Sequence, residues 1–205
     1  MPLKADPTHP SVSGLFRLAV LLLIIATLSG CAAAVVGGVA ATVHDRRSAG
    51  TILDDNAIEL HATDRLHQDG APGRGNHIRV VSYNRTVLLA GEVRTEEAKQ
   101  EAERIVSQVG DVQRVVNELA IGEQTGLGRR SRDTLLTGQI KAALLGTGLP
   151  GFDPARVKVT SLRGIAYLMG LVTEEEAEKV AERVARVRGV KQVVKVFDYI
   201  PESGL

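Results

Sequence analysis

Few side chains in this 205-residue sequence have the type and spacing that metal binding requires. The five histidines are scattered along the chain, at His9, His44, His61, His67 and His77. His61 and His67 stand six residues apart, whereas the paired histidines of a helical zinc site stand four apart. A single cysteine also excludes a thiolate cluster and an internal disulfide. The sequence therefore predicts no metal site and no cofactor.

Patterns typical of catalysis are missing as well. The sequence has no nucleophile elbow and no pairing of cysteine with histidine. Gly126-Leu127-Gly128 is not followed by the lysine and hydroxyl residue of a phosphate-binding loop. Asp54 and Asp55 are expected at the start of a helix, where carboxylates cap the helix and interact favourably with its dipole. We predict that the protein is not an enzyme.

The one cysteine has an informative position. Cys31 follows an uncharged apolar run of 11 residues, Leu18–Leu28, which Arg17 precedes. A basic residue, an apolar run and small residues before a cleavage point form a secretory signal. Leu28-Ser29-Gly30-Cys31 resembles the lipobox of bacterial lipoproteins, in which the cysteine receives the lipid. The sequence predicts a signal peptide over residues 1–30, a palmitate-bearing lipidated Cys31, and a tether over residues 31–53.

An uncleaved transmembrane helix is the alternative interpretation. Leu18–Val43 contains no acid or base over 26 residues and is long enough to cross a bilayer. Gly37, Gly38 and the lower hydrophobicity after Cys31 argue against it. Ala32 is not the aspartate that typically retains lipoproteins in the inner membrane. We therefore expect a lipid-anchored protein on the periplasmic face of the outer membrane.

The remainder of the chain repeats itself. Val87–Val93 (VLLAGEV) aligns with Ala166–Val172 (AYLMGLV) at an offset of 79 positions, and the triplet Ala-Glu-Arg recurs at residues 102–104 and 181–183. Each copy has the pattern of a helix, two strands, a helix with an acidic first turn, and a β-branched last strand. The predicted fold class is α+β: two tandem αββαβ domains, each with a three-stranded mixed sheet and two helices on one face.

Two glycines occupy equivalent places in the copies. Gly91 and Gly170 are expected to end the second strand, where the chain turns towards the helix. Close backbone approach or a positive φ is the usual reason for glycine at such a place, so both are predicted to be structural residues. The first strands are expected at Ile78–Ser82 and Val157–Thr160, and the third at Val112–Leu119 and Val190–Phe197.

These features resemble the BON domain. The resemblance rests on the glycine and valine that close the second strand, the Glu-Ala pair that follows, the Val-x-x-Val-Val of the third strand and the duplication itself. It covers essentially residues 18–200, with domains at 54–122 and 131–200 and a linker at 123–130. It implies an outer-membrane lipoprotein of two BON domains that binds phospholipid through the first helix of its second domain.

Charge is distributed unequally between the two domains. Residues 54–122 hold 12 acids and 8 bases, whereas residues 131–205 hold 9 acids and 11 bases. Without residues 1–30, acids and bases balance over the whole chain, which argues against a nucleic-acid partner because such binding requires a basic excess. The second domain is therefore the better candidate for an anionic partner, and the acidic first domain is expected not to bind.

The first helix of the second domain carries the candidate binding residues. Its core stripe is predicted at Leu136, Ile140, Ala143 and Leu144, and Leu135 lies about 100° away from that stripe. Basic residues beside an exposed apolar side chain suit an anionic membrane surface. The resemblance implies bulky apolar residues at the same place. The predicted lipid-binding residues are Leu135, Leu136, Arg129, Arg130 and Arg132; alternatively, Leu135 packs beneath the linker or on the first domain.

Together these patterns favour a non-enzymatic envelope lipoprotein that binds anionic phospholipid through its second domain and supports outer-membrane integrity. The alternative is a periplasmic adaptor whose domains contact outer-membrane assembly proteins or peptidoglycan. Vesicle binding by the second domain distinguishes the two hypotheses.

Overall fold

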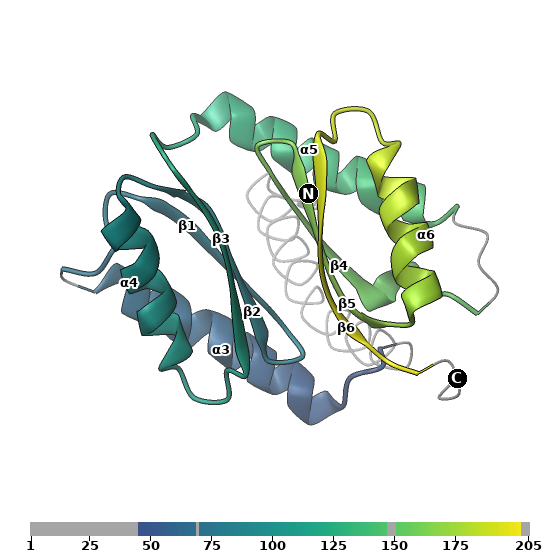
Figure 1. Cartoon of the computed structure of the whole chain (residues 1–205), viewed down its shortest axis with the longest axis horizontal. Coiled ribbons are helices and arrows are strands. Elements are labelled where there is room, and N and C mark those ends of the chain that lie inside the picture. The colour runs from purple at the N-terminus through teal and green to yellow at the C-terminus, as the bar shows by residue number, and fades with distance from the viewer. Residues whose placement is uncertain (1–44, 69, 147–150, 202–205) are drawn as a thin grey trace, which may run out of the picture. The chain divides into compact units, whose positions relative to one another are not determined.

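The structure, a computed structural model, describes residues 45–68, 70–146 and 151–201. These residues form two copies of one αββαβ unit (Figure 1), as predicted. The first copy comprises α3 (Ala49–His67), β1 (His77–Tyr83), β2 (Thr86–Val93), α4 (Glu96–Ser107) and β3 (Arg114–Ile121). The second comprises α5 (Leu127–Leu144), the 3-10 turn η1 (Pro154–Arg156), β4 (Val157–Leu162), β5 (Ile165–Val172), α6 (Glu174–Ala185) and β6 (Gln192–Tyr199). Cys31 and the segments on either side of it lie outside the described residues.

Each copy forms a three-stranded mixed sheet. In the first, β2 is central, antiparallel to β1 and parallel to β3; β5 has the same relation to β4 and β6. The antiparallel strands are joined by two-residue turns, Asn84-Arg85 and Arg163-Gly164, and all four residues have positive φ. Such turns match the twist of a hairpin. The first strands extend further than the sequence predicts, to Tyr83 rather than Ser82 and to Leu162 rather than Thr160.

One face of each sheet is covered by its own two helices, and apolar stripes on those helices fill the space between (Figure 1). Ile58, Ala62 and Leu66 of α3 are buried, as are Leu136, Ile140 and Leu144 of α5. The helical spacing of i, i+4 and i+8 places each set on one side of its helix. The α5 set belongs to the stripe that the sequence predicts for this helix, and Ala143, the fourth predicted member, is half-buried.

The other faces of the two sheets pack against each other, which the sequence analysis did not anticipate. Eight buried residues from both copies form one apolar cluster: Val81, Tyr83, Leu88, Ala90, Leu162, Tyr167, Met169 and Val196. Ion pairs border this cluster, including Lys158–Glu59 at 2.6 Å and Arg114–Asp198 at 2.9 Å. Burial of apolar surface from both copies makes the two sheets one folded body.

The chain enters this body through a segment that contacts both copies. Arg46 forms hydrogen bonds of 2.6 and 2.9 Å with the carboxylate of Glu176 in the second copy. Arg47 pairs with Asp55 of the first copy at 2.6 Å and lies 3.8 Å from the ring centroid of Tyr83. The segment Asp45–Arg47 therefore bridges the two domains.

The first helix begins earlier than expected. Ser48 caps α3, whose first residue is Ala49, so residues 49–53 are helical rather than part of a tether. Asp54 and Asp55 consequently lie beyond the first turn, and the prediction that they cap a helix start is wrong. The carboxylate of Asp55 instead accepts hydrogen bonds from the backbone N–H groups of Asn84 and Arg85 at 2.8 Å each. The buried aspartate holds the hairpin turn.

Gly91 and Gly170 lie inside the second strands, which end at Val93 and Val172 rather than at the glycines. Both are needed because a carbonyl oxygen of the preceding strand lies close. A Cβ at Gly91, where φ is 137°, would overlap the oxygen of His77. A Cβ at Gly170 would lie 2.8 Å from the oxygen of Arg156. Close backbone approach applies at both positions, and a positive φ applies at Gly91 alone.

Candidate functional site

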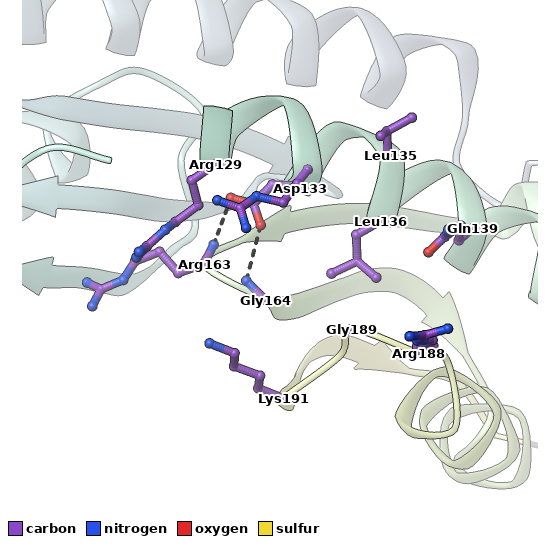
Figure 2. A pocket seen from close by; sticks show the side chains of 11 residues that line it. Arg129, Asp133, Leu135, Leu136, Gln139, Arg163, Gly164, Arg188, Gly189 and Lys191 are labelled. Atoms are coloured by element: carbon purple, nitrogen blue, oxygen red, sulfur yellow. Dashed lines mark hydrogen bonds between the residues drawn. The ribbon is translucent and has the colours of Figure 1, made fainter. Parts of the chain in front are cut away.

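A hollow of 410 Å³ opens beside the N-terminal half of α5. It is lined from α5, from the β4–β5 turn and from the loop between α6 and β6 (Figure 2). We refer to it as the α5 hollow. Its charged residues are Arg129, Arg132, Asp133, Arg163, Arg188 and Lys191.

Two neighbouring leucines have different roles at this site. Leu136 is 7% exposed and belongs to the core of the second copy, so it forms the floor of the hollow. Leu135 is 67% exposed and extends from the outer side of α5 (Figure 2). The alternative in which Leu135 packs beneath the linker or on the first domain is therefore wrong. An exposed leucine lies at the rim of the α5 hollow.

The backbone of the α5 hollow is fixed by three hydrogen bonds. The Asp133 carboxylate accepts from the N–H groups of Arg163 at 2.9 Å and Gly164 at 3.1 Å. The N–H of Lys191 donates to the carbonyl of Gly164 at 2.8 Å. These bonds join α5, the hairpin turn and the segment before β6, so the cationic side chains extend from anchored backbone.

The start of α5 is attached to the first copy. The carboxylate of Glu92 in β2 is buried and accepts hydrogen bonds from the Thr125 hydroxyl and from His77 Nδ1 at 3.0 Å. Burial alone would raise the pKa of Glu92, but these hydrogen bonds outweigh it and hold the pKa below its ordinary value. Arg130 Nε donates to the carbonyl of Thr125 at 2.9 Å. The first turn of α5 is thereby held in place.

Within the described part of the chain, the cations around the α5 hollow have no acidic partners. Elsewhere on the body many bases are paired, as in Arg104–Glu101, Lys179–Glu175 and Lys195–Glu178. Among the residues that the structure describes, Arg129, Arg132, Arg163, Arg188 and Lys191 form no ion pair within 4.0 Å. Their positive charge is left uncompensated and available to an anion.

The structure brings together four of the five predicted lipid-binding residues. Arg129, Arg132, Leu135 and Leu136 line the α5 hollow, whereas Arg130 instead contacts the linker. Leu136 contributes through its place in the core rather than as an exposed side chain.

Three cations of the opposite wall were not predicted from the sequence: Arg163, Arg188 and Lys191. They come from two loops that are distant from α5 in sequence. The excess of bases after residue 131 was the signal that could have found them.

The first copy has the same framework with different side chains. The positions that correspond to Arg132, Leu135 and Lys191 are occupied by Asp54, Ala57 and Gln113. Asp54 is paired with Arg85 at 2.7 Å. The cationic ring is therefore a property of the second copy alone.

The first copy nevertheless exposes leucines of its own. Leu53 and Leu60 on α3 are 69% and 67% exposed. The first copy thus also carries exposed apolar side chains on its first helix, although the position that corresponds to Leu135 is Ala57. Asp64 follows Leu60 by one turn of α3, so this apolar surface has an acidic neighbour where Leu135 has arginines.

The described part of the chain contains neither a candidate membrane span nor a candidate metal cluster. No helix there is long and apolar enough to cross a membrane. No cluster of three or more histidine, cysteine, aspartate or glutamate side chains there could hold a metal ion. The apolar run from Leu18 to Val43 lies outside the described residues.

Comparison with known proteins identifies relatives along most of the chain. The family model for the BON domain matches residues 54–123 and 132–201. The outer membrane lipoprotein DolP of Haemophilus influenzae is 36% identical over 93% of this chain and 99% of its own length. A 21 kDa hemolysin of Actinobacillus pleuropneumoniae is 35% identical, over 76% of this chain and 79% of its own. The osmotically inducible protein Y of Escherichia coli is 30% identical, over 70% and 72% of the two chains.

Proposed function

The chain belongs to the BON-domain family, and from that premise we propose that it is an outer-membrane lipoprotein whose second domain binds anionic phospholipid. In this proposal Cys31 carries the lipid anchor, the two domains lie on the periplasmic face, and the protein supports envelope integrity without catalysis. The similarity to DolP of Haemophilus influenzae, which is named an outer membrane lipoprotein, supports the location.

One observation carries the lipid-binding part of the proposal: an exposed leucine stands beside cations that have no acidic partners. Leu135 is 67% exposed at the rim of the α5 hollow. An apolar side chain that enters the acyl region, with cations at the headgroup level, is the arrangement by which proteins bind an anionic membrane surface. The two halves of the interaction are adjacent here.

The expected affinity is modest. Burial of one leucine contributes about 1.5–3 kcal/mol, and each base near anionic lipid contributes about 1 kcal/mol. With five such bases, the total of roughly 6–8 kcal/mol corresponds to a Kd between about 40 and 1 µM. A lipid anchor at Cys31 would raise the effective concentration of the site at the bilayer, so weak intrinsic binding suffices.

Vesicle co-sedimentation tests the proposal. The unlipidated chain from Ala32 onward should bind vesicles rich in anionic lipid and dissociate as salt rises. Leu135→Glu should abolish this binding. The matched control is Leu53→Glu, which places the same charge at an equally exposed leucine of the first copy. Equal binding by wild type and a folded Leu135→Glu protein would overturn the assignment.

The two-domain body, rather than the second domain alone, is the proper reagent. Separation of the copies would expose the apolar sheet face that contains Tyr167 and Met169. A newly exposed apolar face adheres to lipid for reasons unrelated to the α5 hollow. Vesicle binding by an isolated second domain therefore does not discriminate between the hypotheses.

The anchor is tested separately. Cys31→Ser should leave the precursor unprocessed or release the protein from the membrane, and labelled palmitate should no longer be incorporated. A wild-type protein that takes up no acyl label yet stays membrane-bound would favour the uncleaved apolar helix.

A second candidate function, as a periplasmic adaptor, is favoured by the exposed Leu53 and Leu60 of the first copy. An apolar surface with acidic neighbours suits a protein partner, such as the outer-membrane assembly machinery, better than an anionic bilayer. Crosslinking from position 60 in cells, compared with position 135, tests this alternative. Exclusive capture of proteins from position 60 and of lipid from position 135 would support both roles.

A further inference from the structure

We propose that a second pocket, which lies between the two copies, binds the free C-terminal carboxylate of an apolar peptide. This interdomain pocket has a volume of 610 Å³ and is lined mainly by the start of α3 and by the segment from the end of α5 to β4. It shares no lining residue with the α5 hollow. The inference is therefore independent of the proposed membrane function.

Both copies supply apolar walls to the interdomain pocket. The apolar lining residues are Ile52 and Tyr83 from the first copy, and Ala142, Leu145, Pro154, Ala155 and Val157 from the second. Leu145 is 78% exposed, so a large apolar side chain remains in contact with water. Covering it with apolar atoms of a ligand is favourable. The volume of 610 Å³ falls within the range of about 300–1,000 Å³ that is typical of small-molecule sites.

One cation of the interdomain pocket has no acidic partner. Lys158 is paired with Glu59 at 2.6 Å. Arg47 is paired with Asp55, also at 2.6 Å. Among the residues that the structure describes, Lys141 forms no ion pair within 4.0 Å. The uncompensated charge is that of a single ammonium group, which matches a ligand with one negative charge.

The two acids of the pocket are held by the fold. Asp55 accepts a hydrogen bond from the Ser82 hydroxyl at 2.7 Å, in addition to its bonds with the hairpin turn. Asp153 accepts from the N–H of Ala155 at 2.8 Å and caps η1. A cationic ligand would compete with these bonds and would be repelled by Lys141. The pocket therefore suits an anion better than a cation.

Polar groups among the lining residues favour a peptide over a plain hydrocarbon chain. Asn56 and Asp153 place an amide and a carboxylate in the pocket. A methylene chain laid across them would remove water and return no hydrogen bond, which costs free energy. A peptide alternates amide groups with side chains, so it can bond to these polar atoms while an apolar side chain contacts the walls. Its terminal carboxylate supplies the one negative charge that matches Lys141.

The walls of the pocket are held by contacts between the copies. The Arg47 guanidinium lies 3.8 Å from the ring centroid of Tyr83, whose hydroxyl donates to the carbonyl of Arg156 at 3.2 Å. Lys158 Nζ donates to the carbonyl of Ser82 at 3.0 Å. A prearranged site loses little entropy when a ligand binds. A peptide that contacts both copies should also raise the melting temperature of the whole body.

Isothermal titration calorimetry with the unlipidated chain from Ala32 onward tests this inference. The probe is the N-acetylated tripeptide alanyl-valyl-leucine with a free carboxylate, and its matched ligand is the same tripeptide with a C-terminal amide. Wild type should prefer the carboxylate form about 3- to 5-fold, as expected for one partly exposed ion pair. Lys141→Gln should bind both forms equally. Lys99→Gln, which removes a lysine outside the pocket, should keep the preference.

A variant that fills the pocket distinguishes a defined site from general apolar attraction. Ala142→Trp places a large side chain in the pocket from an exposed position on α5, and should abolish binding with the melting temperature unchanged. The control is Ala57→Trp, at an exposed alanine of α3 outside the pocket, which should bind as wild type does. Equal binding by wild type and a folded Ala142→Trp protein would overturn the site.

The ligand class is tested by the remaining arms. Equal binding of the carboxylate and amide forms by wild type would overturn the role of Lys141 and the proposed ligand with it. Decanoate that binds more tightly than the tripeptide, and is lost in Ala142→Trp, would assign the pocket to a fatty acid and overturn the peptide. No binding of the tripeptide at millimolar concentration would overturn the proposal. Leu135→Glu should bind the tripeptide as wild type does, so failure of this inference and failure of the membrane function are distinguishable.

Discussion

The two copies share a framework and differ in what they do with their charges. In each, a buried aspartate on the first helix holds the hairpin turn, Asp55 in one and Asp133 in the other. Asp55 is also paired with Arg47 at 2.6 Å and accepts from the hydroxyl of Ser82 at 2.7 Å. Asp133 has no ion pair among the described residues.

This comparison separates the positions of the repeated domain that the fold constrains from the positions at which the two copies differ. The aspartate, the turn and the buried stripe are required by the fold, so both copies retain them. The ring around the turn is solvent-exposed, so packing leaves its residue types free to differ between the copies. Near its hairpin turn the first copy pairs Asp54 with Arg85, and Asp55 pairs with Arg47, whereas the five cations around the α5 hollow form no ion pair among the described residues.

The largest expected effect separates Leu136 from its neighbour. Leu136→Glu would place a carboxylate in the core of the second copy, at a cost of several kcal/mol. Because the sheets share one apolar cluster, we expect the whole body to unfold. Leu135→Glu should leave circular dichroism and melting nearly unchanged. A Leu136→Glu protein with native melting would contradict the assignment of this residue to the core.

The glycine pair gives the next largest effect. In Gly91→Ala the new Cβ would overlap the His77 carbonyl oxygen, and the backbone would keep a φ that is unfavourable for alanine. We therefore expect the free energy of unfolding to fall by about 3 kcal/mol or more. Gly170→Ala meets only the contact with the Arg156 carbonyl, and should cost about 1–3 kcal/mol. Urea denaturation of the two variants measures the difference. The reverse order would show that the Arg156 segment is the more rigid of the two.

Acid sensitivity distinguishes two equivalent glutamates. Glu176 lies beside Arg46, with side chains 10% and 12% exposed, whereas Glu97 at the corresponding place is exposed. Burial acts to raise the pKa of Glu176, but the hydrogen bonds from Arg46 and Thr173 outweigh it and lower the pKa below its ordinary 4.5. A carboxylate whose pKa is lower in the native state than in the unfolded state stabilises the fold at pH values above its unfolded pKa. This stabilisation is lost as the pH falls through the native pKa.

Glu176→Gln should therefore cost on the order of 3 kcal/mol at pH 7, and the deficit should shrink below about pH 4, where wild type loses the same interaction. Glu97→Gln serves as the matched control and should change stability little at either pH. A deficit that persists unchanged in acid would contradict a charge effect; loss of the cap would not explain it, because a Gln side chain can still accept the hydrogen bond from the Thr173 N–H.

The smallest expected effect is a gain. Asp54→Arg, Ala57→Leu and Gln113→Lys together copy part of the α5 hollow onto the first domain. The Asp54–Arg85 pair that is lost is about one-third exposed, so its removal should cost less than about 1 kcal/mol. We expect a 2- to 5-fold gain in affinity for anionic vesicles. No gain with a native melting curve would mean that Arg163 and Arg188 are indispensable.

Much of this fold follows from local pattern. The apolar stripes of α3 and α5 and the order αββαβ could be predicted because helical and strand periodicities are visible within one copy. The packing of the two sheets could not, since Tyr83, Tyr167 and Met169 alternate with core residues and look like the ordinary second face of a strand. The site was predicted on α5, where Leu135 and its arginines are neighbours in sequence. Arg163 and Lys191 join it only through tertiary contacts.

The bridge formed by Asp45–Arg47 has a consequence for how the protein is made. Arg46 emerges early, yet its partner Glu176 lies 130 residues later in the chain. At about 5–20 residues per second, synthesis takes roughly 7–26 s to supply that carboxylate. Throughout this interval the first sheet also lacks the apolar surface that will cover Val81, Tyr83 and Leu88. Until the second half of the chain arrives, the exposed apolar face of the first sheet is a surface through which nascent chains can aggregate.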